Sequence, residues 1–357
     1  MIRPHPSRRL PWGGLALLAA LAGARAASAG DDYADKDFGL RLASAFVRFT
    51  EVSAAGGQTA ANRWSPAINP ASLAWTPLPF KWGVVLAPYY SEVDLDNGTR
   101  LHLTGESLTW DTRRWGVVQP TLSQIRANHE ATRQGLGFDY SVDVSQVQWG
   151  KRFDDWAVGV ALNYTRAAVA FDLPTPLGKL RVSDTDATSY RVRLGALHAP
   201  AAKWLAGLVL EYGAAPYRGT AIAMGPFGPI IGPNGPMTVK LRGTQQQFIL
   251  RPGVSYEYAP MSTAYLDYQL GHYWSERGTL NHHLFTAGVD HRLLKPLFVR
   301  AAVSADARGN VAASAGLGVF FSRWSSFDVA YHRYPLPELE PEFGRAGVLQ
   351  FAFNVRF

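Results

Sequence analysis

The feature that most constrains this chain is a ladder of short segments, from residue 80 to the C-terminus, in which apolar and polar side chains alternate. The last segment is the clearest, because one face of an extended strand there would carry Leu349, Phe351, Phe353, Val355 and Phe357. Alternation with period two predicts β-strands with one apolar and one polar face. Such strands build either a soluble sandwich or a membrane barrel that has lipid outside and a wet lumen inside.

Charge on the polar faces favours the barrel, because an unpaired charge is costly in a dry core. Arg191 and Arg193, for example, alternate with Tyr190 and Val192. The side chains expected to point inward are Asp139, Asp143, Arg191, Arg193, Glu211, Arg251, Glu257, Asp267, Asp290, Arg292, Arg300, Asp328 and Arg356. This inner face suits an open porin for polar solutes, and it suits equally a plugged barrel in which opposite charges pair.

Turn signals divide the ladder into about fourteen strands. They are expected at residues 80–92, 99–109, 115–125, 136–149, 155–170, 187–198, 203–213, 242–258, 262–274, 280–293, 297–305, 310–321, 325–334 and 346–357. The longest gaps, 171–186, 214–241 and 335–345, all follow odd-numbered strands. Long loops on one side and tight turns on the other are typical of a barrel with both ends in the periplasm. We therefore expect an all-β fold, a transmembrane antiparallel barrel formed by residues 80–357.

The first 29 residues have the pattern of a cleavable secretory signal peptide. Arginines precede a short apolar run around Leu15–Leu21, and small residues follow at Ala27, Ser28 and Ala29. Removal of residues 1–29, with their four arginines and no acids, lowers the formal net charge from +7 to +3. The remaining chain has no clustered basic face, so a nucleic-acid partner is not expected. Export and a barrel together predict a multi-pass protein of the bacterial outer membrane.

The sequence offers little support for catalysis or for a bound cofactor. The absence of cysteine excludes disulfides, thiolate metal sites and cysteine nucleophiles. His282 and His283 are adjacent on an expected strand, so their side chains point to opposite faces and cannot share a metal ion. No phosphate-binding or dinucleotide motif follows a strand and opens a helix. We expect no metal, no cofactor and no enzymatic activity.

Residues 30–79 lack sustained alternation and are too few to fold alone comfortably, so they are expected to pack onto or into the barrel as a plug. Within them, the stretch from Ala54 to Trp75 contains Asn69, Pro70 and Ala71. Pro70 fixes a backbone angle and Asn69 favours a turn before it, so the structural interpretation is a turn that leads from the plug to the first strand. A direct contact with ligand is the alternative.

This stretch resembles the N-terminal region of the FadL-type hydrophobic-compound transporters of the outer membrane. The resemblance rests on the Asn69-Pro70-Ala71 motif, and it implies a fourteen-stranded barrel plugged by its N-terminal segment, with an apolar extracellular surface that captures ligand. The chain departs from the family in being short and in having Asn62 and Arg63 where an acidic residue often precedes the motif. Related barrels that anchor or secrete other proteins carry a similar motif.

One expected extracellular loop, from Gly213 to Pro236, is long and apolar. Its apolar side chains could form a ligand-capture surface, because exposed apolar patches often mark binding sites. They could equally fold back and cap the barrel. The candidate ligand-binding residues are Ile222, Met224, Phe227, Ile230 and Ile231.

The C-terminal aromatic residue has a separate interpretation. Phe353, Val355 and Phe357 resemble the signal that the outer-membrane assembly machinery reads, so that machinery, the lipid bilayer and lipopolysaccharide are expected partners. Three functions remain open: a channel for hydrophobic small molecules such as long-chain fatty acids or hydrocarbons, a general diffusion porin for polar solutes, and a structural barrel that anchors an exported partner.

Overall fold

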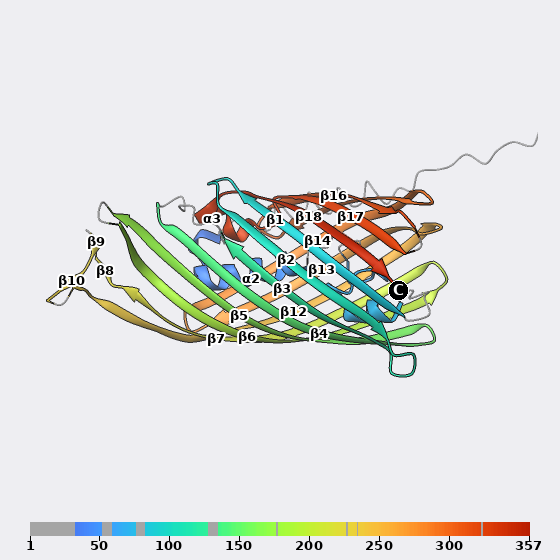
Figure 1. Cartoon of the computed structure of the whole chain (residues 1–357), viewed down its shortest axis with the longest axis horizontal. Coiled ribbons are helices and arrows are strands. Elements are labelled where there is room, and N and C mark those ends of the chain that lie inside the picture. The colour runs from blue at the N-terminus through green and yellow to red at the C-terminus, as the bar shows by residue number, and fades with distance from the viewer. Residues whose placement is uncertain are drawn as a thin grey trace, which may run out of the picture.

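The computed structural model describes residues 33–51, 59–75, 83–127, 135–175, 178–225, 228–233, 235–322 and 324–357. The expected signal peptide lies outside these residues. Within the described part of the chain, fourteen long strands form one closed antiparallel barrel, in which the first strand pairs with the last (Figure 1). The strands are β1 (Val84–Leu95), β2 (Arg100–Asp111), β3 (Val117–Ala127), β4 (Gly137–Phe153), β5 (Trp156–Thr175), β6 (Gly178–Ala201), β7 (Trp204–Ile222), β12 (Thr238–Ala259), β13 (Ser262–Ser275), β14 (Gly278–Leu294), β15 (Leu297–Asp306), β16 (Val311–Phe320), β17 (Ser325–Arg333) and β18 (Ala346–Arg356).

Each expected segment therefore corresponds to one strand, and the predicted number and antiparallel order are confirmed. Among the described helices, none is both long and apolar enough to cross a membrane.

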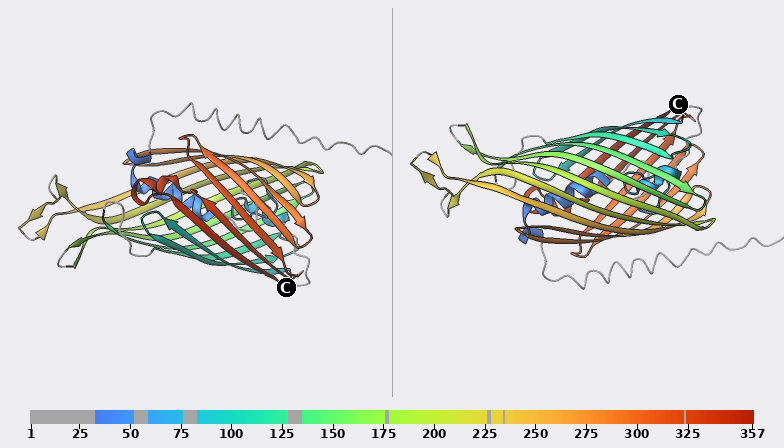
Figure 2. Two further views of the ribbon diagram at one scale, coloured as in Figure 1. Left: turned by 90° about the horizontal axis from the view of Figure 1, so that it is seen from above. Right: turned by 90° about the horizontal axis from the view of Figure 1, so that it is seen from below.

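Two of the three expected long loops are mostly strand, so this part of the prediction is wrong. β5 continues to Thr175 and β6 begins at Gly178, while β7 continues to Ile222 and β12 begins at Thr238. The tip of the β7–β12 hairpin carries two small sheets, β8 (Met224–Gly225) with β9 (Gly228–Pro229) and β10 (Ile231–Gly232) with β11 (Gly235–Pro236). These strands have 19 to 24 residues, whereas a membrane crossing needs about 10, so they project far beyond the rest of the barrel (Figures 1 and 2).

The outer face has the composition of a lipid-facing wall. On β5 the exposed large apolar side chains are Trp156, Val158, Leu162 and Tyr164, and the nine residues from the first to the last span about 26 Å of strand. With the usual strand tilt this length covers an apolar band about 20 Å tall, with an aromatic ring at each end.

The expected inward orientation is wrong for Asp139 and Asp143. Inner-face residues of β4 alternate with them, and Asp143 lies outside, paired with Arg126 at 2.6 Å. The reason is that β4 begins beyond the lipid band. There the inner face packs against the apolar plug while the outer face meets water, so the polarity of the two faces is reversed.

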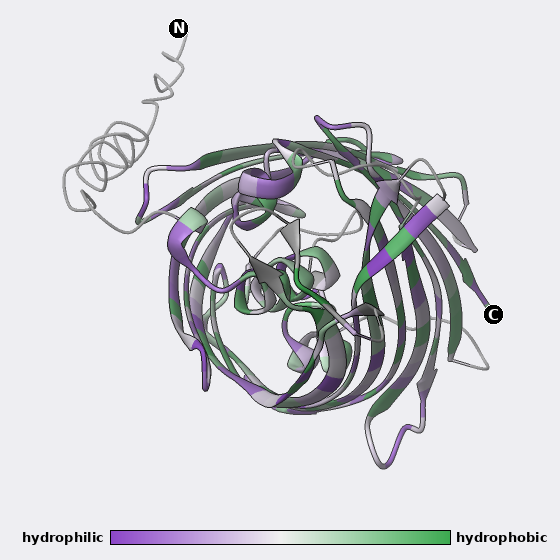
Figure 3. Ribbon diagram, turned by 90° about the vertical axis from the view of Figure 1, so that its left-hand side faces the viewer, coloured by the Kyte–Doolittle hydropathy of each residue, from purple (hydrophilic) through white to green (hydrophobic). Residues whose placement is uncertain are grey.

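The N-terminal segment lies inside the barrel (Figures 2 and 3). It comprises η1 (Tyr33–Asp35), α2 (Phe38–Glu51) and η2 (Pro70–Trp75). Asp37 caps α2 by accepting a hydrogen bond of 3.2 Å from the backbone N–H of Leu40. The helix is apolar around most of its circumference, as expected of a helix surrounded by protein.

One polar stripe interrupts the apolar surface of α2. Arg41, Ser44 and Arg48 stand at positions i, i+3 and i+7, and all three are buried. They face the segment between β17 and β18, which contains η3 (Pro337–Leu339) and α3 (Glu340–Phe343) and folds into the barrel mouth.

Buried ion pairs join these two segments, and we call them the plug clamp. Arg48 donates to both carboxylate oxygens of Glu338 at 3.1 and 3.2 Å, and Ser44 donates to Glu338 at 2.9 Å. Arg41 makes a bidentate pair with Glu342 at 2.5 and 2.6 Å. Although burial lowers it, the Glu338 carboxylate raises the pKa of Arg48 above its ordinary value, so the guanidinium stays charged.

Replacing Arg48 with Met leaves Glu338 as a buried unpaired carboxylate. We expect the R48M variant to lose about 3–5 kcal/mol of stability, because removal of one partner of a buried ion pair leaves the other uncompensated. Chemical unfolding in detergent micelles, together with hydrogen exchange of α2, measures the loss. The matched control is R100M, which breaks the exposed pair of Arg100 with Asp94 and should cost less than about 1 kcal/mol. Equal effects of the two changes would contradict the clamp.

Candidate ligand pathway

An apolar pocket lies between α2, the β17–β18 segment and the ends of β1 to β4. Its unfilled volume is about 20 Å³, enough for roughly one water-sized sphere, so a ligand enters it by displacing side chains. Every side chain that lines it is apolar or aromatic: Leu42, Ala45, Phe46, Phe49, Leu95, Leu101, Ile125, Phe138, Tyr140, Leu336, Leu339 and Phe343.

Aromatic rings make up much of this pocket. The ring centroid of Phe138 lies 4.8 Å from that of Phe343 and 5.3 Å from that of Phe171, and Phe38 meets Phe171 edge-on at 5.5 Å. Tilted and edge-on rings at these separations attract one another beyond their buried area. The pocket therefore already favours contact with aromatic rings.

A second, larger cavity lies further along the lumen and has a volume of about 470 Å³. The plug contributes Trp64, Pro66 and Leu73 to its wall, and the barrel contributes mostly hydroxyl, amide and guanidinium groups. A cavity of this size can hold a small organic ligand together with water.

The inner face of β4 joins the two cavities and changes in polarity between them. It presents Phe138 and Tyr140 to the apolar pocket, then Val144, then Gln146 and Gln148 to the larger cavity. β3 repeats the change with Ile125 followed by Ser123, Thr121 and Gln119, and β2 with Leu101 followed by Ser107 and Thr109. The lumen is thus apolar at the end with the projecting strands, whereas the other end combines polar groups with apolar side chains.

Many inward charges are paired, as expected for a plugged barrel. Arg193 donates to Glu211 at 2.6 Å, Arg300 donates to Asp328 at 2.7 Å, and Arg251 pairs with Asp267. Arg193 also donates to the carbonyl oxygen of Ala67, so the charged wall holds the plug directly. Pairing of this kind keeps a buried charge tolerable.

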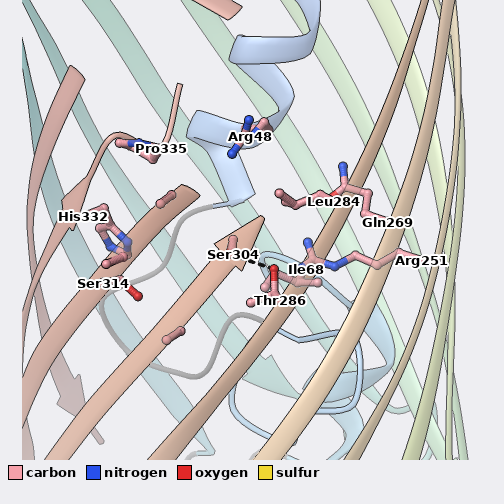
Figure 4. Close-up of a pocket in the computed structure, with 13 residues that line it drawn as sticks. Arg48, Ile68, Arg251, Gln269, Leu284, Thr286, Ser304, Ser314, His332 and Pro335 are labelled. Atoms are coloured by element: carbon pink, nitrogen blue, oxygen red, sulfur yellow. Dashed lines mark hydrogen bonds between the residues drawn. The ribbon is translucent and has the colours of Figure 1, made fainter. Parts of the chain in front are cut away.

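A third cavity, of about 40 Å³, lies on the opposite wall. Figure 4 shows Arg48 approaching it from α2 and Ile68 from the plug turn, with His332 and Ser314 across from Gln269. It is roughly large enough for two or three water molecules, and we assign no ligand to it.

The Asn69-Pro70-Ala71 motif anchors the other end of the plug. The Asn69 side chain donates to the carbonyl oxygens of Ala60 at 2.7 Å and Ala196 at 3.1 Å, and it accepts from the N–H of Ala71 at 3.0 Å. Pro70 then begins η2. The motif thus makes the hydrogen bonds of a turn and binds the plug to β6.

A row of glycines in the wall makes room for this turn. Gly150, Gly159 and Gly195 stand opposite one another on β4, β5 and β6, and we call them the glycine row. A methyl group on Gly159 would overlap the backbone of Pro70, and one on Gly150 would lie 2.9 Å from the Pro70 carbonyl oxygen. Only the absence of side chains lets η2 lie directly on the sheet.

The candidate residues in the β7–β12 hairpin are not brought to the apolar pocket. Ile222 is buried, Ile230 and Ile231 are exposed, and none of the three lines the pocket. The backbone of Met224 lies in β8, and Phe227 lies outside the described residues. At the C-terminus, Phe353 and Phe357 are exposed on the outer face and Val355 is partly buried.

Sequence reasoning missed the pocket itself. Phe138 and Tyr140 alternate with Asp139, a pattern that predicts side chains facing lipid. A helical period was present at Phe38, Leu42, Phe46 and Phe49, spaced by three or four residues. That signal would have identified α2 and its apolar face.

Substitution of Gly159 by Ala tests the glycine row. The added methyl group forces η2 away from β5, and we expect G159A to lose about 1–3 kcal/mol and to raise hydrogen exchange in residues 59–75. The control is G137A, whose methyl group would lie at an ordinary 3.4 Å from the nearest atom. Unchanged exchange in G159A would show that η2 does not rest on this wall.

No protein-family model and no curated protein matches the sequence. Solved structures do match in fold. The toluene transporter TbuX of Ralstonia pickettii superposes with a TM-score of 0.56 at 13% identity, covering 86% of this chain and 98% of that one. The CymD monoaromatic hydrocarbon channel gives 0.54 at 14%, covering 87% and 97%. A Pseudomonas aeruginosa FadL homologue gives 0.51 at 12%, covering 87% and 98%.

At identities this low, structural similarity establishes a shared fold. The resemblance that the sequence suggested is confirmed at that level: the chain has the plugged fourteen-stranded barrel fold of FadL-type channels.

Proposed function

We propose that this protein is an outer-membrane channel for the uptake of small hydrophobic molecules. The apolar pocket carries the proposal, because twelve apolar or aromatic side chains close around it at the end of the barrel with the projecting strands. The fold is shared with structures described as toluene and monoaromatic hydrocarbon channels, which supports the same class of substrate.

The energetics suit a ligand the size of a single aromatic ring. Transfer of a ring from water into such a pocket contributes roughly 1.5–3 kcal/mol, as burial of a Phe side chain does. The space present is small, so binding requires α2 or the β17–β18 segment to move. The plug clamp, which joins these two elements, is therefore the contact that regulates entry.

A general porin is the second candidate, and the hydroxyl, amide and guanidinium groups in the wall of the cavity of about 470 Å³ favour it. The plug opposes it, since α2, η2 and the inward side chains that bind them occupy the lumen. A polar solute would have to cross the apolar pocket without a hydrogen-bond partner.

The surroundings follow from the outer face. We propose that the apolar band lies in the outer-membrane bilayer with lipopolysaccharide beside the projecting strands, and that the assembly machinery recognises Phe353, Val355 and Phe357. Asn69, Pro70 and Ala71 then act as the plug anchor. Of the candidate ligand-binding residues, Ile230 and Ile231 are exposed at the tip of the β7–β12 hairpin and would meet ligand first. The proposed role is transport and includes no catalytic step.

Flux through the purified barrel in lipid vesicles tests the proposal. We expect uptake of toluene or a long-chain fatty acid above that of protein-free vesicles, and no flux of a small sugar. Deletion of residues 30–68 removes α2 and should admit the sugar. Sugar flux through the intact protein would establish a porin instead. Absence of flux for every solute would leave the structural barrel.

Leu101 offers a point test of the pocket. Its replacement with Asn places an amide among apolar side chains. Bound toluene would displace water from this amide without offering it a hydrogen bond, so we expect toluene affinity to fall roughly tenfold. Fluorescence competition or calorimetry in detergent measures the change. V239N is the control, since Val239 is exposed on the projecting part of β12. Unchanged affinity in L101N would exclude this pocket as the binding site.

A further inference from the structure

Three polar groups in the wall of the larger cavity have hydrogen-bonding atoms without partners. Asn163 is 6% exposed, and its side-chain Nδ2 has no hydrogen-bond partner within the described residues. Gln148, 2% exposed, donates to Gln146 at 3.0 Å but its Oε1 accepts nothing there. The Nε of Arg191 likewise has no acceptor among the described groups. Buried polar atoms are nearly always paired, so three in one cavity wall indicate a place for a ligand.

The three groups lie together. In the sheet register Asn163 stands directly opposite Gln146 on β4 and Arg191 on β6, and Gln148 is two residues further along β4. All of them line the same cavity. We call Gln148, Asn163 and Arg191 the polar triplet.

Charge at the triplet is unbalanced in the positive direction. Arg191 and Arg193 share one carboxylate, that of Glu211. Glu211 lies 2.6 Å from Arg193 and 2.6 Å from the amide of Gln247, but 3.4 Å from Arg191. Arg191 is therefore the less neutralised guanidinium, and an oxygen atom of a ligand would stabilise it.

Arg191 also connects the two cavities. Its guanidinium carbon lies 5.0 Å from the ring centroid of Phe46, which lines the apolar pocket, while its side chain lines the larger cavity. Val144 lines the larger cavity two residues before Gln146 on β4, so a ring that lies against Val144 can place an oxygen atom at the triplet.

We propose that the preferred ligands are aromatic compounds with an oxygen head group, a hydroxyl or a carboxylate, which the polar triplet binds in the larger cavity while the ring lies against Val144 in the same cavity. This inference rests on the proposed function and narrows its substrate class. Asn163 and Arg191 donate to the oxygen, and Gln148 accepts the proton of a hydroxyl. A hydrocarbon leaves all three unpaired, and sites built for such groups reject ligands that lack them.

Calorimetric titration of the folded full-length protein with phenol, benzoate and toluene tests the proposal. We expect phenol or benzoate to bind roughly tenfold or more tightly than toluene, as charge-assisted hydrogen bonds imply. In N163L this advantage should largely disappear while toluene binding is unchanged. Equal affinity for the three compounds, or an advantage that persists in both N163L and Q148L, would overturn the inference and leave the hydrophobic channel intact.

Two further variants separate the contributions and control for folding. N163D adds a carboxylate beside Arg191, so benzoate binding should fall at least tenfold while phenol binding is retained. Benzoate affinity that is unchanged in N163D would overturn the assignment of the triplet. Q124L replaces an exposed amide on the outer face of β3 and should change nothing. Circular dichroism verifies the barrel in each variant. If no compound binds even the wild-type protein, the proposed function fails and the inference fails with it.

Discussion

Pairing of β1 with β18 is the constraint on which the rest of the structure depends. The hydrocarbon core of a bilayer offers no water to backbone N–H and C=O groups, so a sheet that crosses it has to close on itself. Closure fixes the size of the lumen, and a fourteen-stranded lumen is too wide for wall side chains alone to fill. The plug occupies that space, and its arginines form ion pairs with carboxylates of the β17–β18 segment.

The polarity of the lumen follows from how the plug is distributed. At one end α2 and the β17–β18 segment bring apolar faces together, so the wall there is aliphatic and aromatic. At the other end the plug is a turn and a short 3-10 helix, which leave more of the wall uncovered, and the wall there carries hydroxyl and amide groups. The inner face of β4 carries both kinds of side chain within a dozen residues, apolar next to α2 and polar next to the larger cavity.

Much of the fold could be predicted from the sequence, because alternation with period two reports which faces meet lipid. All fourteen strands were predictable on that basis, and the plug was predictable from the lack of alternation in residues 30–79. The prediction failed beyond the bilayer, where Asp139 and Asp143 face water and Phe138 faces the plug. Alternation alone does not show where the membrane ends. The pocket was also hidden because its walls come from α2, β1 to β4 and the β17–β18 segment, which only tertiary packing brings together.

The plug clamp has a consequence for the order of assembly. Glu338 and Glu342 belong to the segment between the last two strands, and their partners Arg41 and Arg48 lie near the start of the described chain. The first-made part of the protein therefore waits for the last-made part before its buried charges are neutralised. Because β18 also completes the sheet, closure of the barrel and neutralisation of these charges both depend on the same late-made stretch of the chain, and a barrel closed without its plug would leave both carboxylates without their arginine partners.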